Sequence, residues 1–283
     1  MADFTLRVMS LFKKNHQSVE GITHLRDGHE NLTIYSGKAL EGVRRACEVA
    51  ALVLRRIKDA VTPGLSTLDL DRLAGEFIRE AGGKSADFGY KGYPRQICIS
   101  LNDVVVHGIG RSDVIIQPGD LVSLDITVNF EGYIGDNACT IIAGGVEDAE
   151  KQRLIDTTRA SLEAGIAAAR AGRRVGDIGA AVETVVTAAG YSVVRDMVGH
   201  GCGKTMHEAP QVPNYRCSGT PRLYPGMVLA IEPMVNVGTW RIKIDKEDGW
   251  TVRTLDGSLS AHFEHQILIT DNDPEILTWQ KIA

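Results

Sequence analysis

Two acidic side chains stand inside segments that otherwise read as buried β-strands. Asp125 and Asp136 occur in the apolar runs Leu121–Phe130 and Tyr133–Ile142, which Glu131-Gly132 joins as a predicted hairpin. Side chains alternate between the faces of a strand, so a pairing whose residue numbers sum to an odd value puts both carboxylates on one face. Carboxylates that face each other repel unless a cation lies between them. A solvated surface position is the alternative, but Asp is depleted in the middle of strands.

A second acidic pair lies in the other half of the chain. Glu232 stands in Val-Leu-Ala-Ile-Glu-Pro-Met-Val, and Glu264 stands in Ser-Ala-His-Phe-Glu-His-Gln-Ile-Leu-Ile. Four carboxylates on strands, with a nearby histidine, suit two divalent cations, whose charge they balance. Bridging carboxylates hold such cations ~3.5–4 Å apart, with a shared water as the nucleophile. The four acids therefore predict a site for two metal ions.

Three histidines accompany these acids in predicted glycine-flanked loops. His107 comes before a Gly-Ile-Gly segment, His200 stands between two glycines, and His207 comes seven residues later. Glycine lacks a side chain and lets a ligand or another backbone approach closely. A lone histidine is usually a structural residue, but three beside an acid cluster indicate ligands or proton carriers. Gly203-Lys204-Thr205 ends like a phosphate-binding loop, but Val198 stands where that motif requires glycine, so we reject phosphate binding.

Helices and strands alternate along the chain in an order that positions these residues. Apolar residues at helical spacing, with polar starts and glycine stops, predict helices over residues 40–57, 67–81, 150–171 and 177–189. We predict strands over residues 96–101, 121–130, 133–142, 228–236, 241–244, 249–254 and 260–270. The stretch 209–226 holds four of the nine prolines and is predicted to be a loop.

Two helices followed by antiparallel strands occur twice, about 108 residues apart. Gly64 and Gly82 are separated by the same interval as Gly172 and Gly190, and each pair brackets the second helix of its half. An internal duplication predicts one α+β domain in which a joined antiparallel sheet is covered by helices, with ligands on its open face. Coincidence in a chain rich in alanine and glycine is the alternative.

Composition limits the class of protein and its compartment. The chain has 283 residues, 43% of them hydrophobic, which indicates a globular protein with a sizeable core. A net charge of -5 gives no positive field for nucleic acid, and no apolar run is long enough to span a membrane. Five scattered cysteines without a CxxC pair, and no secretory signal, favour the cytoplasm. We expect residues 1–35 to be an irregular leader and residues 36–283 to be a single domain.

Several segments, taken together and in order, resemble one known family, the type I methionine aminopeptidases. They are Asn-Asp-Val-Val-Val-His-Gly at 102–108, Ser-Leu-Asp-Ile-Thr at 123–127 with Gly-Asp at 135–136, Gly-His-Gly-Cys-Gly at 199–203, Met-His-Glu-Ala-Pro-Gln-Val at 206–212, Ile-Glu-Pro-Met at 231–234 and Phe-Glu-His at 263–265. The resemblance runs from about Ser36 to Lys281. It implies the pita-bread fold, in which two pseudo-symmetric halves share a central antiparallel sheet. It also implies five metal ligands: Asp125, Asp136, His200, Glu232 and Glu264.

The resemblance further implies a reaction and the residues that perform it. Such enzymes remove the N-terminal methionine of nascent proteins when the next residue is small, using a hydroxide that bridges two metal ions (Co, Mn, Fe or Zn). Glu232 would be the general base, while His107 hydrogen-bonds the scissile amide and His207 meets the developing oxyanion. A pocket for the methionine side chain would be formed by Tyr90, Tyr93, Cys98, Met206 and Trp250, although ordinary core packing is an alternative for its aromatic residues. A monovalent cation, Na or K, is implied near Asn102, Val104 and Ser260.

Three positions depart from the pattern of that family. Met206 stands where phenylalanine is common, Lys91 replaces a histidine between Tyr90 and Tyr93, and Asp87 replaces a cysteine. These changes touch the pocket and its rim and bear on substrate preference. All five implied ligands are present.

Other readings remain open at this point. An Xaa-Pro peptidase shares the fold and ligands but usually carries a separate N-terminal domain, for which 35 residues are too few. A non-catalytic relative used as a binding module would typically lack ligands, and a type II enzyme would carry a long helical insertion in its second half. For the type I reading, the expected partners are nascent chains near ribosomes, without nucleic acid or membrane, and the family is mostly monomeric.

Overall fold

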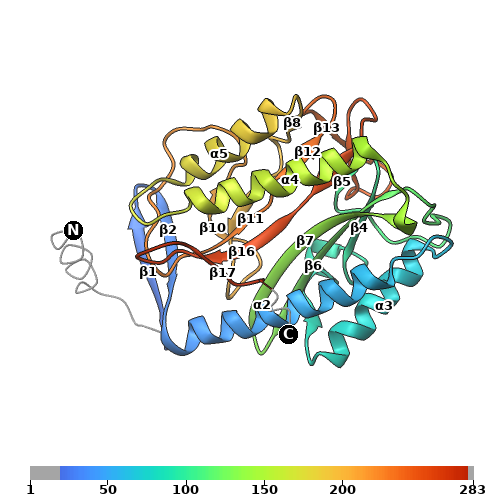
Figure 1. The fold of residues 1–283 in the computed structure, drawn as a ribbon. Helices are drawn as coiled ribbons and strands as arrows, with labels where there is room; N and C mark the ends of the chain where they lie inside the picture. The colour runs from blue at the N-terminus through green and yellow to red at the C-terminus, as the bar shows by residue number, and fades with distance from the viewer. Residues whose placement is uncertain (1–19, 280–283) are drawn as a thin grey trace.

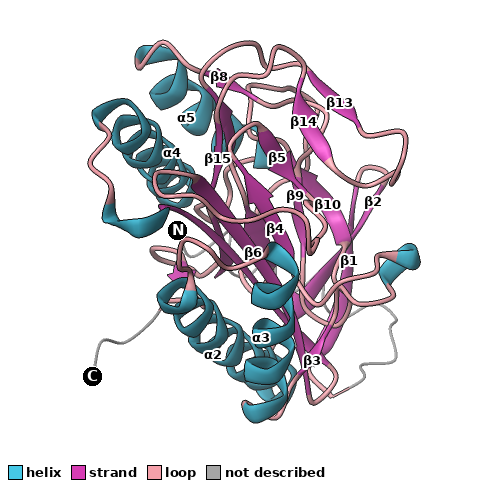
Figure 2. Ribbon diagram, turned by 90° about the vertical axis from the view of Figure 1, so that its right-hand side faces the viewer, coloured by secondary structure: helices cyan, strands magenta, loops and turns pink. Residues whose placement is uncertain are grey.

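The computed structural model describes residues 20–279 of the chain, in which helices cover one face of a central sheet (Figures 1 and 2). Within this range the α-helices are α2 (Gly37–Ala60), α3 (Thr67–Glu80), α4 (Ala149–Ala168) and α5 (Val175–Ala188). Each predicted helix is therefore present, with ends that differ by three residues or fewer. Side-chain caps explain two of the starts: Ser66 accepts the Asp69 N–H at 3.1 Å, and Asp148 accepts the Lys151 N–H at 3.0 Å.

The central sheet joins strands from both halves of the chain. Its order is β10 (Glu208–Val212), β9 (Gly199–Gly201), β11 (Val228–Ile231), β16 (Glu264–Leu268), β7 (Tyr133–Ile142), β6 (Leu121–Phe130) and β3 (Lys84–Ser85), with β4 (Cys98–Leu101) also on β6 and β17 (Glu275–Ile276) on β16. The halves meet where β16 pairs antiparallel with β7, with Glu264 opposite Ala138 and His265 opposite Asn137. Acidic side chains from both halves therefore reach the same region of one sheet.

Three small sheets complete the described structure. One contains β15 (Ser260–His262), β12 (Met234–Asn236) and β8 (Ser192–Val193), and another contains β13 (Ile242–Ile244), β14 (Val252–Thr254) and β5 (Val104–Val106). The third is a hairpin of β1 (Ile22–Asp27) and β2 (Glu30–Tyr35). Two 3-10 turns are η1 (Tyr90–Gly92) and η2 (Ala143–Gly145).

The two halves repeat local hydrogen bonds at corresponding glycines, which agrees with the predicted duplication. The Gly64 N–H donates to the Ile116 carbonyl and the Gly172 N–H to the Leu223 carbonyl, both at 2.8 Å. The four bracketing glycines have φ angles of 92°, 79°, 83° and 82°, a left-handed conformation that glycine adopts without steric cost.

Helix α2 packs directly on β7 because Gly135 has no side chain. A Cβ atom at Gly135 would lie 2.2 Å from the Ala46 carbonyl oxygen and 2.7 Å from the Cys47 nitrogen, both backbone atoms of α2. Backbone atoms within a helix cannot move aside independently, so the helix itself would have to shift. This contact holds α2 close to the strand that carries Asp136.

We expect Gly135→Ala to lower the free energy of unfolding by about 2–3 kcal/mol, the upper range for an overpacked core. Urea unfolding followed by circular dichroism measures this change. Gly145→Ala is the matched control, because a Cβ there meets nothing within 4 Å and only the φ of 64° is unfavourable. Equal losses in the two variants would contradict the close approach as the cause.

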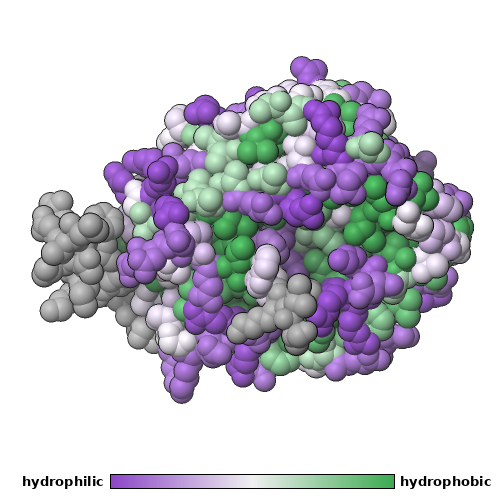
Figure 3. All heavy atoms as spheres, viewed as in Figure 1, coloured by the Kyte–Doolittle hydropathy of each residue, from purple (hydrophilic) through white to green (hydrophobic). Residues whose placement is uncertain are grey.

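The helical face is hollowed between α2 and α4, where apolar side chains lie among charged ones (Figure 3). This groove has a volume of about 800 Å³, and its walls include Leu162, Ile166, Phe263 and Trp279. Asn137 and His265 line it, whereas their neighbours Asp136 and Glu264 line a cavity on the other face of the sheet. The alternation of side chains along β7 and β16 thus separates the groove from the acid cluster.

The prediction of an irregular leader over residues 1–35 is wrong for its second part. Strands β1 and β2 pair over six residues each, and Leu32 and Ile34 are buried in the core. The sequence contains local signals for this hairpin, because Asp27-Gly28 is a typical turn pair and the apolar residues of β2 alternate. Residues 1–19 lie outside the described residues.

The prediction of a loop over 209–226 is also wrong at its start. Strand β10 runs to Val212 and pairs with β9, which contains His200, so that histidine is in a strand rather than in a loop. Pro210 is tolerated because it lies where the register shifts between Glu208 and Gln211, in the strand at one edge of the sheet.

Two long predicted strands are each divided in the structure. Residues 228–236 form β11 and β12, separated by Glu232 and Pro233, and residues 260–270 contain β15 and β16, separated by Phe263. Proline has no N–H to donate, and the two parts of each segment pair in different sheets. Both breaks therefore occur beside a predicted metal ligand.

Candidate metal centre and peptide site

A cavity of about 220 Å³ opens on the face of the sheet away from the helices. The five side chains predicted as metal ligands all line it, and they come from five strands or strand ends: Asp125 from β6, Asp136 from β7, His200 from β9, Glu232 after β11 and Glu264 from β16. The cavity thus brings together residues that are as much as 139 positions apart in the sequence (264 less 125).

The hairpin places its two acids as the alternation of side chains predicts. Asp125 is opposite Ala138, and Asp136 is opposite Thr127, so both acids project from the same face. The Thr127 hydroxyl donates to Asp136 Oδ1 at 3.1 Å and orients that carboxylate. The turn residues Glu131 and Gly132 have φ angles of 51° and 81°, which a tight two-residue hairpin requires.

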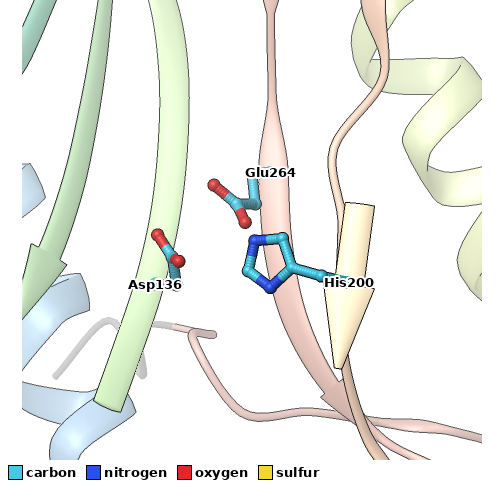
Figure 4. Close-up of side chains that lie close together, drawn as sticks. All are labelled: Asp136, His200 and Glu264. Carbon is cyan, nitrogen blue, oxygen red and sulfur yellow. The ribbon is translucent and has the colours of Figure 1, made fainter. Parts of the chain in front are cut away.

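Three of the five side chains form a compact set of donor atoms. Single ligand atoms of Asp136, His200 and Glu264 lie within 4.8 Å of one another, and the three side chains point toward one another from β7, β9 and β16 (Figure 4). Glu232 Oε1 lies 3.4 Å from His200 Nε2. Oxygen and imidazole donors in this arrangement suit a divalent metal of the Mn, Fe, Co or Zn type.

Burial makes the acid cluster unfavourable without a cation. Loss of hydration raises the pKa of Asp125 to about 7 and raises the pKa values of Asp136, Glu232 and Glu264 well above their ordinary range. For the last three the charge of Asp125 adds to the effect. Glu264 Oε1 is buried and has no hydrogen-bond partner among the described residues. Bound dications would supply the missing partner and compensate the charge, so the residues fit a metal centre.

His200 is held in the form that binds metal. Its Nδ1 lies 3.0 Å from the Gly201 carbonyl oxygen, which can only accept, so Nδ1 carries the proton and Nε2 is left free toward Glu232. Burial lowers the pKa of His200 to about 3, which keeps the ring neutral. A carbonyl partner of this kind fixes both the tautomer and the orientation of a histidine ligand.

The two predicted catalytic histidines lie at the same cavity. His207 Nδ1 is 2.8 Å from the Tyr90 hydroxyl, and its ring centroid is 4.2 Å from that of His200. His107 follows β5 with a φ of 59° and meets the Trp250 ring at a centroid distance of 6.1 Å. Burial lowers the pKa of His107 to about 4, so its ring is neutral near pH 7.

The predicted side-chain pocket is part of this cavity. Its lining includes Tyr90, Tyr93, Cys98, Met206 and Trp250. Tyr93 and Trp250 pack edge to face at 5.2 Å, and the Tyr93 hydroxyl donates to the Gly108 carbonyl at 2.9 Å. Lys91 also lines the cavity, with its Nζ 5.3 Å from the centroid of the Tyr90 ring. The aromatic residues thus form a wall next to the acids and are not scattered through the core.

Asp87 is a fifth buried carboxyl group in the cavity, where sequence analysis expected only a change in the pocket or its rim. It accepts the Thr127 N–H at 3.2 Å, and loss of hydration followed by the charges of Asp125 and Asp136 raises its pKa. It lines the cavity together with the acid cluster and the pocket wall. No local pattern around Ala86-Asp87-Phe88 distinguishes such a position from an exposed loop.

His262 is a further residue at the site that sequence analysis missed. It is 1% exposed, and neither ring nitrogen has a hydrogen-bond partner within residues 20–279. Its Nε2 lies 3.9 Å from Glu232 Oε2, whereas His200 Nε2 lies 3.4 Å from the other oxygen, Oε1. A signal existed, because His262 stands two positions before Glu264 in a segment predicted to be a strand.

Two of the three residues implied for a monovalent cation, Asn102 and Ser260, are in direct contact. The Ser260 N–H donates to the Asn102 carbonyl at 2.9 Å, and Val104 is two residues further along, at the start of β5. The Ser260 hydroxyl is buried and has no partner among the described residues. This site stays a prediction.

Comparisons with known proteins agree with this geometry. Residues 41–271 match metallopeptidase family M24. The chain belongs to this family. It is 44% identical over 248 residues to a methionine aminopeptidase of Clostridium acetobutylicum, covering 87% of this chain and 98% of the relative. It is 42% identical over 250 residues to methionine aminopeptidase A of Synechocystis, covering 88% and 98%. The M24 chain therefore lies among the methionine aminopeptidases, as its motifs predict.

Solved structures confirm the predicted fold class of this M24 metallopeptidase. The methionine aminopeptidase of Rickettsia prowazekii superposes with a TM-score of 0.85 at 40% identity, covering 88% of this chain and all of that one. A prolidase from Pyrococcus furiosus gives 0.70 at 21% identity, covering 88% of this chain and 66% of that one, and so shares the fold. Both belong to the pita-bread architecture. Within residues 20–279, no helix combines the length and apolar character that crossing a bilayer would need.

Proposed function

We propose that this chain removes the N-terminal methionine from newly made polypeptides when the second residue is small. Two divalent cations would be held by Asp125, Asp136, His200, Glu232 and Glu264. The observation that carries the proposal is the convergence of these five side chains on one cavity that also contains an aromatic and thioether-lined wall. The similarity of this chain to methionine aminopeptidases supports the same activity.

A pair of adjacent dications, when bound, lowers the pKa of a water molecule and polarises the carbonyl of the peptide bond. Cobalt, manganese, iron and zinc all suit this mixed carboxylate and imidazole set. The monovalent cation, Na or K, would bind near Asn102, Val104 and Ser260, on the segments that begin β5 and β15.

Glu232 is assigned as the general base. Its carboxylate lies between His200 and His262, at 3.4 Å and 3.9 Å, and it faces the cavity. A carboxylate at this position can take a proton from water and deliver it to the leaving amine. Among residues 20–279, none of the other three acidic ligands has carboxylate oxygens within 4 Å of two histidines.

His207 and His107 are assigned to hold the peptide bond. If the Tyr90 hydroxyl donates to His207 Nδ1, the Nε2 of that histidine carries the proton and can stabilise a developing oxyanion. Neutral His107 can accept or donate a hydrogen bond at the scissile amide. The side chain of methionine, which is unbranched and polarizable, would pack against Tyr93, Cys98, Met206 and Trp250.

The cellular setting follows from this substrate. Nascent chains carry the N-terminal methionine, so we propose that the protein acts in the cytoplasm near ribosomes. We propose that it acts as a monomer, because one chain supplies all of the site residues.

Hydrolysis of Met-Ala-Ser and Ala-Pro peptides tests the proposal against the Xaa-Pro peptidase alternative. We expect kcat/KM for methionine release to exceed that for Ala-Pro cleavage by at least about a hundredfold, because the two substrates differ in a side chain that fills the pocket. Preferred cleavage of Ala-Pro would support the alternative. Stoichiometric metal binding without either activity would indicate a binding module.

A further inference from the structure

We infer that the N-terminal hairpin β1–β2 is part of the active-site architecture, and that the Tyr35 hydroxyl positions the loop that carries Met206 and His207. The loop comprises residues 203–207 between β9 and β10. Tyr35, at the end of β2, is a positioning residue, since it acts through the loop rather than on the substrate. The expected effect on activity rests on the proposed function. The contact between Tyr35 and the loop does not depend on it.

A hydrogen-bond cluster joins the hairpin to the loop. The Tyr35 hydroxyl donates to Glu208 Oε1 at 2.7 Å and accepts the Lys204 N–H at 2.6 Å. Glu208 Oε1 also accepts the Lys204 N–H at 2.8 Å and the Thr205 N–H at 3.0 Å. Two successive backbone amides of the loop are therefore held by one hydroxyl and one carboxylate oxygen. Hydrogen bonds to a charged acceptor are among the stronger ones in proteins.

The hydroxyl is fixed in space by the body of the protein. Tyr35 is 2% exposed, and its N–H donates to the Gly226 carbonyl at 2.7 Å. Preceding residues of β2, Leu32 and Ile34, are buried in the core of the second half. Burial, and then the charge of Glu208, raises the pKa of Tyr35, so the hydroxyl keeps its proton for donation.

The approach of the Tyr35 ring to the loop depends on Gly203. A Cβ atom at Gly203 would lie 2.4 Å from the Tyr35 ring and hydroxyl. The Gly203 carbonyl accepts the Ile134 N–H at 2.8 Å, which ties the start of the loop to β7, two residues from Asp136. The loop is thus held at one end by the sheet and at its middle by Tyr35 and Glu208.

The position of the loop determines the position of His207. Met206 and His207 follow Lys204 and Thr205 directly and line the cavity. His207 must reach the Tyr90 hydroxyl at 2.8 Å and lie against the His200 ring at a centroid distance of 4.2 Å, so a small shift of the loop would break both contacts. A misplacement of about 1 Å can cost a large factor in rate. Removing the hydroxyl should therefore reduce activity even though Tyr35 touches no substrate.

Tyr35→Phe removes only the hydroxyl, and Tyr224→Phe is its matched control. The Tyr224 hydroxyl also bonds to the hairpin, through Asp27 Oδ2 at 3.4 Å, and within residues 20–279 it has no hydrogen bond to residues 203–207. We expect Tyr35→Phe to lower kcat/KM for Met-Ala-Ser by about tenfold, mostly in kcat, and Tyr224→Phe to stay within about twofold of the wild type. In a His207→Ala background, Tyr35→Phe should cause less than a twofold further loss, because it acts through that histidine.

Amide hydrogen exchange tests the contact without any assay of activity. We expect the Lys204 and Thr205 amides to exchange at least about fivefold faster in Tyr35→Phe, and at the wild-type rate in Tyr224→Phe. Glu208→Gln weakens the same hydrogen-bond cluster by removing the charged acceptor. If Tyr35→Phe fails to fold, this variant should show the faster exchange of the Lys204 and Thr205 amides instead.

The outcomes separate the two proposals. Unchanged exchange at Lys204 and Thr205 in both cluster variants overturns the inference, as does an equal loss of activity from Tyr35→Phe with and without His207. A wild-type protein that does not hydrolyse Met-Ala-Ser contradicts the proposed function alone, because faster exchange in the variants would still support the role of Tyr35 in positioning the loop.

Discussion

Replacing Glu232 by glutamine is expected to lower kcat/KM for Met-Ala-Ser by at least about a thousandfold, within the range found for loss of a general acid–base group. Glutamine keeps the size of the side chain but cannot take a proton from water. Among the described residues, Glu232 is the acid of this cluster with carboxylate oxygens within 4 Å of His200 and of His262, so no other acid stands in an equivalent position.

The measurement is steady-state hydrolysis together with metal content determined on the same samples. Glu275→Gln is the matched control, because Glu275 pairs with Arg44 at 2.6 Å and is absent from the cavity lining. It should retain activity within about twofold. A Glu232→Gln variant that keeps a near-normal rate and normal metal content would refute the assignment of the base.

Removal of the metal is expected to abolish activity and to lower the thermal midpoint by at least about 5 °C, with both restored by added Mn or Co. The apo protein buries several carboxyl groups with raised pKa values. Such groups bind protons more tightly in the folded state, so unfolding releases protons and the stability of the apo protein falls as pH rises. For Asp125 this loss of stability occurs in the pH range between its ordinary pKa of 3.8 and its raised pKa of about 7.

The metal-bound form should show the opposite trend across the same window. Metal ions need deprotonated ligands, so their affinity rises with pH while the apo form weakens. The difference in midpoint between the metal-bound and chelated protein should therefore grow from pH 5 to pH 7.5, as differential scanning fluorimetry would report. Asp136→Asn should lose most of this difference, whereas Asp273→Asn, at an exposed pair with Arg170, should keep it. A difference that shrinks with rising pH would contradict the site.

Sequence alone predicted the central hairpin closely because its information is local. Strands β6 and β7 begin and end at the predicted residues, since alternation and the Glu131-Gly132 turn are both contained within 22 consecutive positions (142 less 121, plus one). The same alternation placed Asp125 and Asp136 on one face without knowledge of the rest of the fold. The equal spacing of Gly64 and Gly82 and of Gly172 and Gly190, which predicted two similar halves, can likewise be seen in the sequence alone.

Apart from the β1–β2 hairpin, whose signals are local, the errors concern contacts between segments that are far apart in the chain. Tyr35 meets Glu208, and β10 is a strand because β9 pairs with it. The Asp87 carboxylate accepts the N–H of Thr127 in β6, 40 positions further along the chain, and His262 of β15 lies 3.9 Å from Glu232. Neither hydrophobic pattern nor residue type reports such partners. The fold and the five acid and histidine ligands could thus be proposed from sequence, whereas the surrounding residues required coordinates.

Anomalous diffraction from a manganese-soaked crystal tests the central claim most directly, since each metal peak is located without reference to activity. The account predicts two peaks about 3.5–4 Å apart, with Asp125, Asp136, Glu232 and Glu264 around them and His200 bound through Nε2. The absence of any peak in this cavity at saturating manganese, or peaks only elsewhere on the protein, would contradict it.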